Sequence, residues 1–246
     1  MKVTFLGVGE AVDENYGNTS ILIEGGENIL LDCGFTVPPA LWKYNSDPNF
    51  LDAICISHQH ADHSFGVTPV LLRMWEDKRT KPLALFGQNI ETLVKAQFDF
   101  GYKGFMNKIT YPLNFLNINA DSKACVGAMK LEFSRTTHSV ENLAVRVSSK
   151  DTSVCYTGDG RITEDTEKLF SSASLVIVET KFIDKNVDGH SAVVSTLKLA
   201  SKNKINRLAM VHLDRHARKE KERILTIIKE YHVNAFVPEP GNSITL

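Results

Sequence analysis

The sequence Ser57-His58-Gln59-His60-Ala61-Asp62-His63 places three histidines and one aspartate within six residues. The apolar run Asp52–Ser57 predicts a buried strand, and in extended backbone the two histidines around Gln59 point the same way. A helical turn after these two histidines would carry the aspartate and the third histidine round to a neighbouring point. Because zinc takes neutral imidazoles and carboxylates as ligands in proteins, this stretch predicts a metal site.

Further ligands are expected elsewhere, because this cluster alone cannot complete two coordination spheres. Three candidates stand at the ends of other predicted strands: His138 after Ala128–Ser134, Asp159 after Ser153–Thr157, and His212 at the end of Leu208–His212. The full set is His58, His60, Asp62, His63, His138, Asp159 and His212. It can hold two metals about 3.5–4 Å apart, with Asp159 as the natural bridge. A lone histidine is more often an ordinary core or surface residue, so the compact 58–63 cluster carries this interpretation.

The composition is that of an ordinary globular protein. The chain has 246 residues, of which 43% are hydrophobic and 23% charged, and its formal net charge is −1. A chain of this length can bury a core without a metal staple, so a metal site is expected to serve function. The near-zero net charge gives no argument for nucleic acid as a partner.

No stretch of the sequence has the pattern of a signal peptide or of a membrane span, so a cytoplasmic protein with no membrane partner is expected. The four cysteines are Cys33, Cys55, Cys125 and Cys155. Their wide spacing favours buried free thiols in a reducing compartment.

Strands and helices alternate along the chain after an antiparallel meander at its start. Strands are predicted over 3–6, 20–24, 28–32, 52–57, 128–134, 143–148, 153–157, 175–179, 208–212 and 235–237. Helices are predicted over 88–100, 164–170, 191–200 and 217–231. Both halves run from strand-rich to helix-bearing, so we expect an α/β fold in which residues 1–246 form one domain with two similar layers.

The run His58–His63, with the later candidates, resembles the metallo-β-lactamase-fold hydrolases over nearly the whole chain. That resemblance implies a four-layer αβ/βα sandwich with its metals at one edge. It also implies how the ligands divide: His58, His60 and His138 on one metal, Asp62, His63 and His212 on the other, and Asp159 between them. Two divalent ions are expected, zinc first, with manganese, iron or cobalt left open.

Finer motifs are similar to ribonuclease Z and its phosphodiesterase relatives: Phe5-Leu6-Gly7-Val8-Gly9, Leu31-Asp32-Cys33-Gly34, Thr137–Asn142 and Gly158-Asp159. The loop Gly189-His190-Ser191-Ala192 looks like the one that in this branch supplies a histidine to the departing oxygen. The alternative is that His190 only begins a helix capped by Ser191 or Asp188. Glu179 either orients His190 or has a capping role.

Two departures separate the chain from the tRNA-processing enzymes of that branch. Those enzymes carry an RNA-binding arm between the ligands that match His138 and Asp159, where twenty residues intervene here. Their loop after the first glycines bears Pro and Lys or Arg, whereas Asp13–Asn18 is acidic. The stretch Arg215–Arg223 could meet a phosphate, but its mixed charges favour an exposed helix face. RNA is therefore not the favoured partner.

The chemistry implied is metal-dependent hydrolysis of a small or nucleotide-derived phosphodiester. In that scheme two ions lower the pKa of a bridging water, Asp62 orients the resulting hydroxide, and His190 donates to or stabilises the departing oxygen. The alternatives are a carboxylic ester, lactone or thioester hydrolase on the same fold, and a tRNA 3′-end endonuclease. A scaffold protein without turnover is disfavoured, because every ligand is retained. The resemblance also suggests a homodimer.

Overall fold

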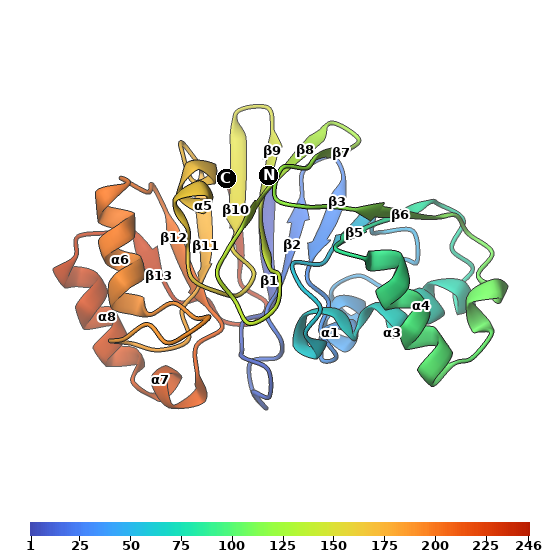
Figure 1. Ribbon diagram of the computed structural model, residues 1–246, viewed down its shortest axis with the longest axis horizontal. Helices are drawn as coiled ribbons and strands as arrows, with labels where there is room; N and C mark the ends of the chain where they lie inside the picture. Colours follow the sequence, from blue (N-terminus) through green and yellow to red (C-terminus); the bar gives the residue numbers. More distant parts are fainter.

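Two seven-stranded β-sheets face each other in the computed structural model, which describes residues 1–246 (Figure 1). In spatial order, the first sheet contains β14 (Ser243–Thr245), β1 (Lys2–Gly7), β2 (Ser20–Glu24), β3 (Asn28–Leu31), β4 (Ala53–Cys55), β5 (Leu83–Gly87) and β6 (Leu113–Asn117). Strands β1 to β3 pair antiparallel, and β3 to β6 pair parallel. The predicted meander at the start of the chain is confirmed.

The second sheet repeats this plan. In spatial order it contains β13 (Ala235–Phe236), β12 (Leu208–Val211), β11 (Leu175–Glu179), β10 (Thr152–Tyr156), β9 (Leu143–Ser149), β8 (Met129–Arg135) and β7 (Lys123–Val126). Strands β7 to β10 pair antiparallel, and β10 to β13 pair parallel. Each half of the chain therefore begins with an antiparallel meander and continues with parallel strands.

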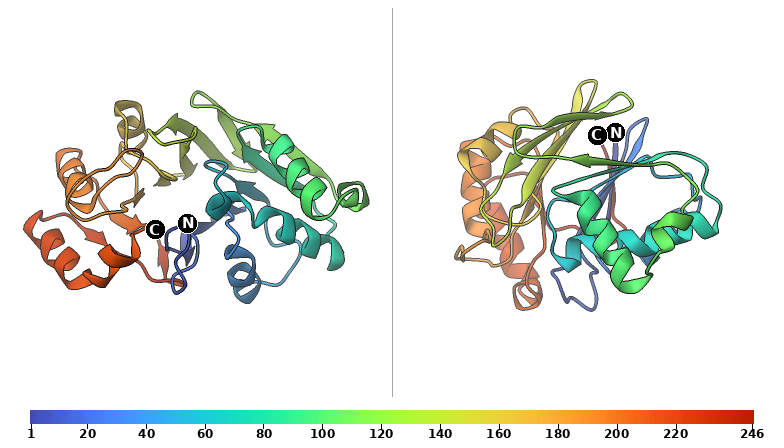
Figure 2. Two further views of the ribbon diagram at one scale, coloured as in Figure 1. Left: turned by 60° about the horizontal axis from the view of Figure 1, so that its bottom comes forward. Right: turned by 45° about the vertical axis from the view of Figure 1, so that its right-hand side comes forward.

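Helices cover the outer face of each sheet (Figures 1 and 2). The helices are α1 (Val37–Tyr44), α2 (Ala61–Ser64), α3 (Val67–Glu76), α4 (Ile90–Gly101), the 3₁₀ helix η1 (Phe105–Lys108), α5 (Glu164–Leu169), α6 (Val193–Lys202), α7 (Arg215–Lys219) and α8 (Lys221–Glu230). Helices α1, α3 and α4 lie on the first sheet, and α6 and α8 lie on the second. The expected four-layer αβ/βα sandwich is confirmed.

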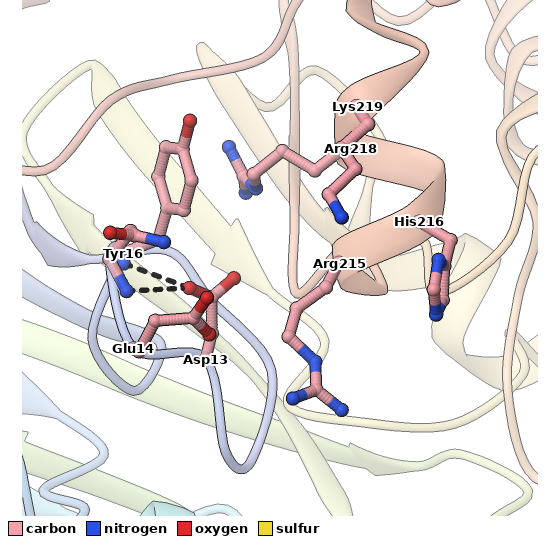
Figure 3. A pocket seen from close by; sticks show the side chains of 8 residues that line it. Asp13, Glu14, Tyr16, Arg215, His216, Arg218 and Lys219 are labelled. Carbon is pink, nitrogen blue, oxygen red and sulfur yellow. Dashed lines mark hydrogen bonds between the residues drawn. The ribbon is translucent and has the colours of Figure 1, made fainter.

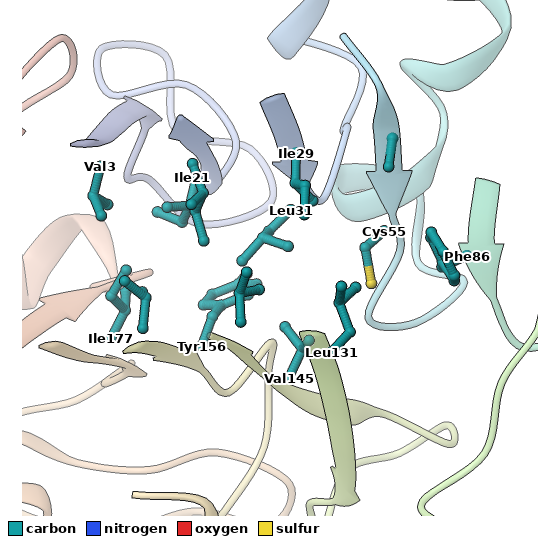
Figure 4. Close-up of a cluster of buried hydrophobic side chains, with 14 of the residues drawn as sticks. Val3, Ile21, Ile29, Leu31, Cys55, Phe86, Leu131, Val145, Tyr156 and Ile177 are labelled. Carbon is teal, nitrogen blue, oxygen red and sulfur yellow. The ribbon is translucent and has the colours of Figure 1, made fainter. Parts of the chain in front are cut away.

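Apolar side chains fill both faces of the central strands. In β2, Ile21 and Ile23 pack in the core between the two sheets, whereas Leu22 packs with the helices of the outer layer. From the second sheet, Tyr156 and Ile177 enter the same inter-sheet core (Figure 4). All five side chains are almost fully buried. Burial on both faces is what a strand between two layers requires, and it explains the nearly continuous apolar runs in the sequence.

The helical turn expected after His60 is α2, whereas other elements lie where the sequence predicted none, namely α1, α3, η1, β5, β6, β7 and β14. Strands β6 and β7 lie at sheet edges and expose many of their side chains, so their sequences show little apolar periodicity. Helix α3 was missed although its buried residues Val67, Val70, Leu71 and Met74 have helical spacing, and Pro69 lies in the first turn, where a helix tolerates proline. The single helix predicted over 217–231 is two helices, α7 and α8, separated at Glu220.

The cysteines are all free. Cys33, Cys55 and Cys155 are buried as predicted, but Cys125 is exposed, so the prediction of four buried thiols was wrong there. The reason is that Cys125 lies on β7, the edge strand of its sheet. The two ends of the chain meet where β14 pairs with β1 (Figure 2). None of the helices combines the length and the apolar character needed to cross a membrane.

Candidate metal centre

The seven predicted ligands meet at one edge of the molecule, where the two sheets face each other. Each one follows a strand or lies on a short helix: His58 and His60 follow β4, Asp62 and His63 lie on α2, His138 follows β8, Asp159 follows β10 and His212 follows β12. Strand β4 belongs to the first sheet and the other three belong to the second. The site is therefore assembled from both halves of the chain.

The first group contains His58, His60 and His138. The Nε2 atom of His58 lies 3.0 Å from Nδ1 of His60, and that same Nδ1 lies 3.2 Å from Nε2 of His138. Nitrogen ligands about 2.05 Å from a tetrahedral zinc lie about 3.3 Å from one another. The spacing of these nitrogens thus suits a single metal ion. The prediction that the first two histidines point the same way is confirmed.

The second group contains Asp62, His63 and His212. The Oδ2 atom of Asp62 lies 3.3 Å from Nε2 of His63 and 3.4 Å from Nε2 of His212. Asp159 places Oδ1 at 3.4 Å from the same His63 nitrogen and Oδ2 at 3.9 Å from Nε2 of His138. One carboxylate oxygen of Asp159 therefore faces each group, which is the arrangement of a bridging ligand.

Two observations test whether these residues fit metal ions. The buried atoms His63 Nε2 and Asp159 Oδ1 have no hydrogen-bond partner, which is costly unless something else satisfies them. Burial alone would lower the pKa of His63, but Asp159 and Asp32 outweigh it and hold this pKa well above its ordinary value. This point in the site therefore favours positive charge. A divalent ion supplies that charge and satisfies both atoms, so the residues fit the group.

Three of the neighbouring ligands have the protonation states that metal binding requires. Burial and the nearby His63 lower the pKa of His58 well below its ordinary value, so His58 is neutral. Burial would raise the pKa of Asp62, but the adjacent imidazoles of His212 and His63 outweigh it and lower this pKa. The pKa of Asp159 is likewise lowered against burial by His212 and His63. Both carboxylates are therefore ionised.

A second layer of contacts orients the imidazole rings. His63 Nδ1 donates to Oδ2 of Asp32 at 2.7 Å, and His138 Nδ1 donates to the carbonyl of Gly189 at 2.8 Å. Such contacts fix the ring and the tautomer of a metal-binding histidine. Asp32 was not among the predicted site residues. Asp32 directly follows β3 and belongs to the motif Leu31-Asp32-Cys33-Gly34, and this position could have indicated its role.

His190 lies beside the ligand set. Its ring centre is 5.1 Å from that of His138, and its Nδ1 lies 3.0 Å from Oε1 of Glu179. The other carboxylate oxygen of Glu179 accepts from the main-chain N–H of Ser191 at 2.9 Å. Burial lowers the pKa of His190 to about 4, so its imidazole is neutral at neutral pH. Glu179 therefore orients both the ring of His190 and the loop that carries it.

The alternative in which this loop caps a helix is wrong. Helix α6 begins at Val193 and its N-cap residue is Ala192, not Ser191 or Asp188. The main-chain N–H of Ala192 donates to Oδ1 of Asn186 at 2.8 Å. His190 is thus outside the helix, and its side chain is free to serve the site.

The basic stretch Arg215–Arg223 is not a uniformly exposed helix face. Arg218 is only 6% exposed, because its guanidinium lies 4.0 Å from the centre of the Tyr16 ring and donates to the carbonyl of Val8. The prediction was wrong for this residue, whereas Arg223 is exposed as expected. Helix α7 and the 13–16 loop border an open pocket of about 390 Å³ (Figure 3), lined by Asp13, Glu14, Asn15, Tyr16, Arg215, His216, Arg218 and Lys219.

The fold places this protein in the metallo-β-lactamase-fold class. The structure of the metallo-β-lactamase-fold protein YhfI from Bacillus subtilis matches with a TM-score of 0.81 and 22% identity, over 99% of this chain and 98% of that one. Within this class, the chain belongs to the anti-Pycsar protein Apyc1 family, whose model matches residues 1–233.

Relatives by sequence agree with that placement. The anti-Pycsar protein Apyc1 of Paenibacillus harenae is 29% identical over 133 residues, which cover 54% of this chain and 53% of that protein. Ribonuclease Z of Methanococcus maripaludis strain C5 is 33% identical over 123 residues, 49% of this chain. The chain spans only 38% of the length of that ribonuclease Z. The predicted resemblance to the ribonuclease Z branch is confirmed.

Proposed function

We propose that the chain is a metal-dependent phosphodiesterase that hydrolyses a small or nucleotide-derived phosphodiester. The observation that carries the proposal is His190, a neutral imidazole that Glu179 orients beside the ligand set. Cleavage of a diester leaves an alkoxide that needs a proton, and a histidine placed next to the reacting group can supply one.

The roles of the residues follow from their positions. The ions would be held by His58, His60 and His138 on one side, by Asp62, His63 and His212 on the other, and by Asp159 between them. When bound, such ions supply an activated water and offset charge on the phosphoryl oxygens. The Asp62 carboxylate orients the attacking water. His190 accepts a proton from that water at Nε2 and passes it to the departing oxygen, while Glu179 holds its Nδ1–H.

Two features support a small substrate over tRNA. Strands β9 and β10 are joined by the two-residue turn Lys150-Asp151, which leaves no arm between His138 and Asp159. The 13–16 loop carries Asp13 and Glu14 where the tRNA enzymes would be expected to carry basic residues, so it lacks the positive charge that favours a polyanion. A tRNA 3′-end endonuclease is therefore the weaker candidate. A carboxylic ester, lactone or thioester hydrolase remains the alternative that the experiment below separates.

Other expectations belong with this proposal. We propose that the activity serves the anti-Pycsar role for which the family is named. The core shared by the two sheets supports residues 1–246 as one domain. A cytoplasmic homodimer that binds about two zinc ions is the expected form, and manganese, iron or cobalt would suit the same ligands.

The test compares diesters that differ in their leaving group. Wild type is expected to hydrolyse both bis-p-nitrophenyl phosphate and nucleoside cyclic monophosphates. The His190→Ala variant should lose about 10²- to 10⁴-fold in kcat on the cyclic substrate, whose departing alkoxide needs a proton, and less on p-nitrophenolate release. Metal content, measured on the same samples, should stay at about two ions per chain. His216→Ala, which removes an exposed histidine of α7, is the matched control.

A different pattern would favour carbonyl chemistry. If the enzyme hydrolyses p-nitrophenyl acetate or a lactone but no phosphodiester, and if His190→Ala leaves that rate unchanged, the phosphodiesterase proposal fails. The likeness to ribonuclease Z would then reflect shared fold ancestry only.

A further inference from the structure

Lys181 places an ammonium group beside His190 at the rim of the metal centre. It is the second residue after β11, and its main chain is held on both sides. Its N–H donates to the carbonyl of Ser191 at 3.0 Å, and its carbonyl accepts from the N–H of Asp214 at 2.9 Å. The half-buried side chain brings Nζ to 3.3 Å from Nε2 of His190. The fold therefore fixes where this charge lies.

This ammonium has no carboxylate partner, and its only side-chain hydrogen bond is the one to His190. Two other cations in this part of the molecule are paired: Arg215 lies 2.9 Å from Glu10, and Arg223 lies 2.8 Å from Asp184. A partly buried charge without a counter-ion is costly, so an anion that binds there gains stabilisation.

The contact with Lys181 also sets the tautomer of His190. An ammonium can only donate, so Nε2 of His190 accepts and its proton lies on Nδ1, where it is donated to Glu179. The resting imidazole consequently offers no N–H from Nε2. The hydrogen-bond donor available at this face of the site is the ammonium of Lys181.

We propose that Lys181 binds a non-bridging oxygen of the substrate's phosphoryl group and so selects anionic phosphodiesters over neutral esters. This inference rests on the proposed phosphodiesterase function and names the residue that recognises the charge of the substrate. Binding draws the ammonium away from Nε2 of His190. Nε2 of His190 is then free to accept a proton during hydrolysis. Binding of the anion to Lys181 therefore also releases His190 for its role in proton transfer.

The experiment uses two substrates with the same leaving group, the anionic bis-p-nitrophenyl phosphate and the neutral triester diethyl p-nitrophenyl phosphate. Because p-nitrophenolate departs from both substrates without a proton, and because any part of His190 in activating the water is common to both, the comparison reports on the charge of the phosphoryl group. Lys181→Met should lower kcat/KM for the diester by about 10- to 100-fold, as expected for loss of a charged hydrogen bond, and change the triester by no more than about twofold. Lys181→Arg should recover most of the diester rate.

Binding of inorganic phosphate gives a readout that needs no turnover. Calorimetry on the metal-loaded proteins should show about tenfold weaker phosphate binding by Lys181→Met than by wild type. Lys185→Met is the matched control, because it removes the same charge from an exposed lysine four residues further on. It should bind phosphate and cleave both esters as wild type does.

Equal losses on diester and triester would overturn the proposal, since Lys181 would then act only by positioning His190. Unchanged diester kinetics would overturn it as well. A wild-type enzyme that cleaves no diester would refute the phosphodiesterase function itself. In that case the phosphate titration still decides about Lys181, because undiminished binding by Lys181→Met removes its role as an anion contact.

Discussion

Asp32 organises the metal centre although it is not one of the proposed ligands. Its Oδ1 accepts from the N–H of Ser57 at 2.7 Å, and its Oδ2 accepts from the Ser57 hydroxyl, the Tyr156 hydroxyl and Nδ1 of His63. A fully buried carboxylate is costly, and these four donors compensate for the lost water. Burial and the charge of Asp32 raise the pKa of Tyr156 well above its ordinary value, so this phenol stays a donor.

Replacing Asp32 by Asn should weaken the second metal position. The amide replaces one acceptor oxygen by an N–H₂ group, which conflicts with one or more of these four donors, and it removes the negative charge that Nδ1–H of His63 faces, so the contact that orients the His63 ring is weakened. We expect metal affinity at that position to fall by about 10- to 100-fold, measured by zinc titration against a chelating dye. Asp151→Asn, in the exposed turn between β9 and β10, is the control. Unaltered binding of two ions by Asp32→Asn would contradict this account.

At the scale of elements, two loops hold the ligand-bearing helix α2 by backbone packing. The turn after β3 donates from the N–H of Cys33 to the carbonyl of His63 at 2.8 Å. A Cβ atom on Gly34 would lie 1.9 Å from the carbonyl oxygen of Asp62, and one on Gly66 would lie 2.2 Å from the carbonyl oxygen of Gly34. Only glycine permits this approach, so these two positions set where the ligands of α2 lie.

Gly34→Ala should therefore displace α2 and damage both stability and metal binding. We expect a loss of about 1–3 kcal/mol or more in the free energy of unfolding, together with reduced metal content. Gly101→Ala provides the contrast, because a Cβ there meets no atom within 4 Å and the residue ends helix α4. That variant should change stability by no more than about 1 kcal/mol. Urea unfolding and metal analysis of both variants measure these effects. Equal stability and equal metal content in the two variants would contradict this account.

At the scale of the whole molecule, the core between the sheets and the two outer cores bury groups that cannot ionise in the folded chain. Burial raises the pKa values of Cys33 and Cys55 well above their ordinary range and that of Cys155 to about 12. Burial also raises the pKa of Tyr111 above its ordinary value. In the unfolded chain these thiols and this phenol ionise at their ordinary pKa values.

Stability should consequently fall as the pH rises above about 9. There the unfolded chain loses thiol protons that the folded chain retains, so the stabilisation is present below the unfolded pKa and is lost as pH rises. Each thiol contributes about 1.4 kcal/mol per pH unit, and the three together about 4 kcal/mol per unit. Urea unfolding at pH 8, 9 and 10 measures the slope. A Cys33→Ala, Cys55→Ala and Cys155→Ala triple variant should lose most of it, and an undiminished slope in that variant would show that other groups are responsible.

The sequence alone determined the features that depend on residues close together in the chain. The spacing within His58–His63 sets which side chains face one point, because strand alternation and a helical turn are local geometry. Apolar periodicity located most strands of both sheets, and the positions just after those strands identified His138, Asp159 and His212. Edge strands such as β7 were missed, because exposed side chains carry no apolar pattern.

Only the tertiary structure decided the contacts between distant segments. Asp32 meets Tyr156 across 124 positions in the sequence, and Arg218 meets Val8 across 210. The periodicity of apolar residues does not predict such contacts, because they depend on which loops the two sheets bring together. Burial and the absence or presence of a partner give a charged side chain its role, and both are properties of the assembled fold.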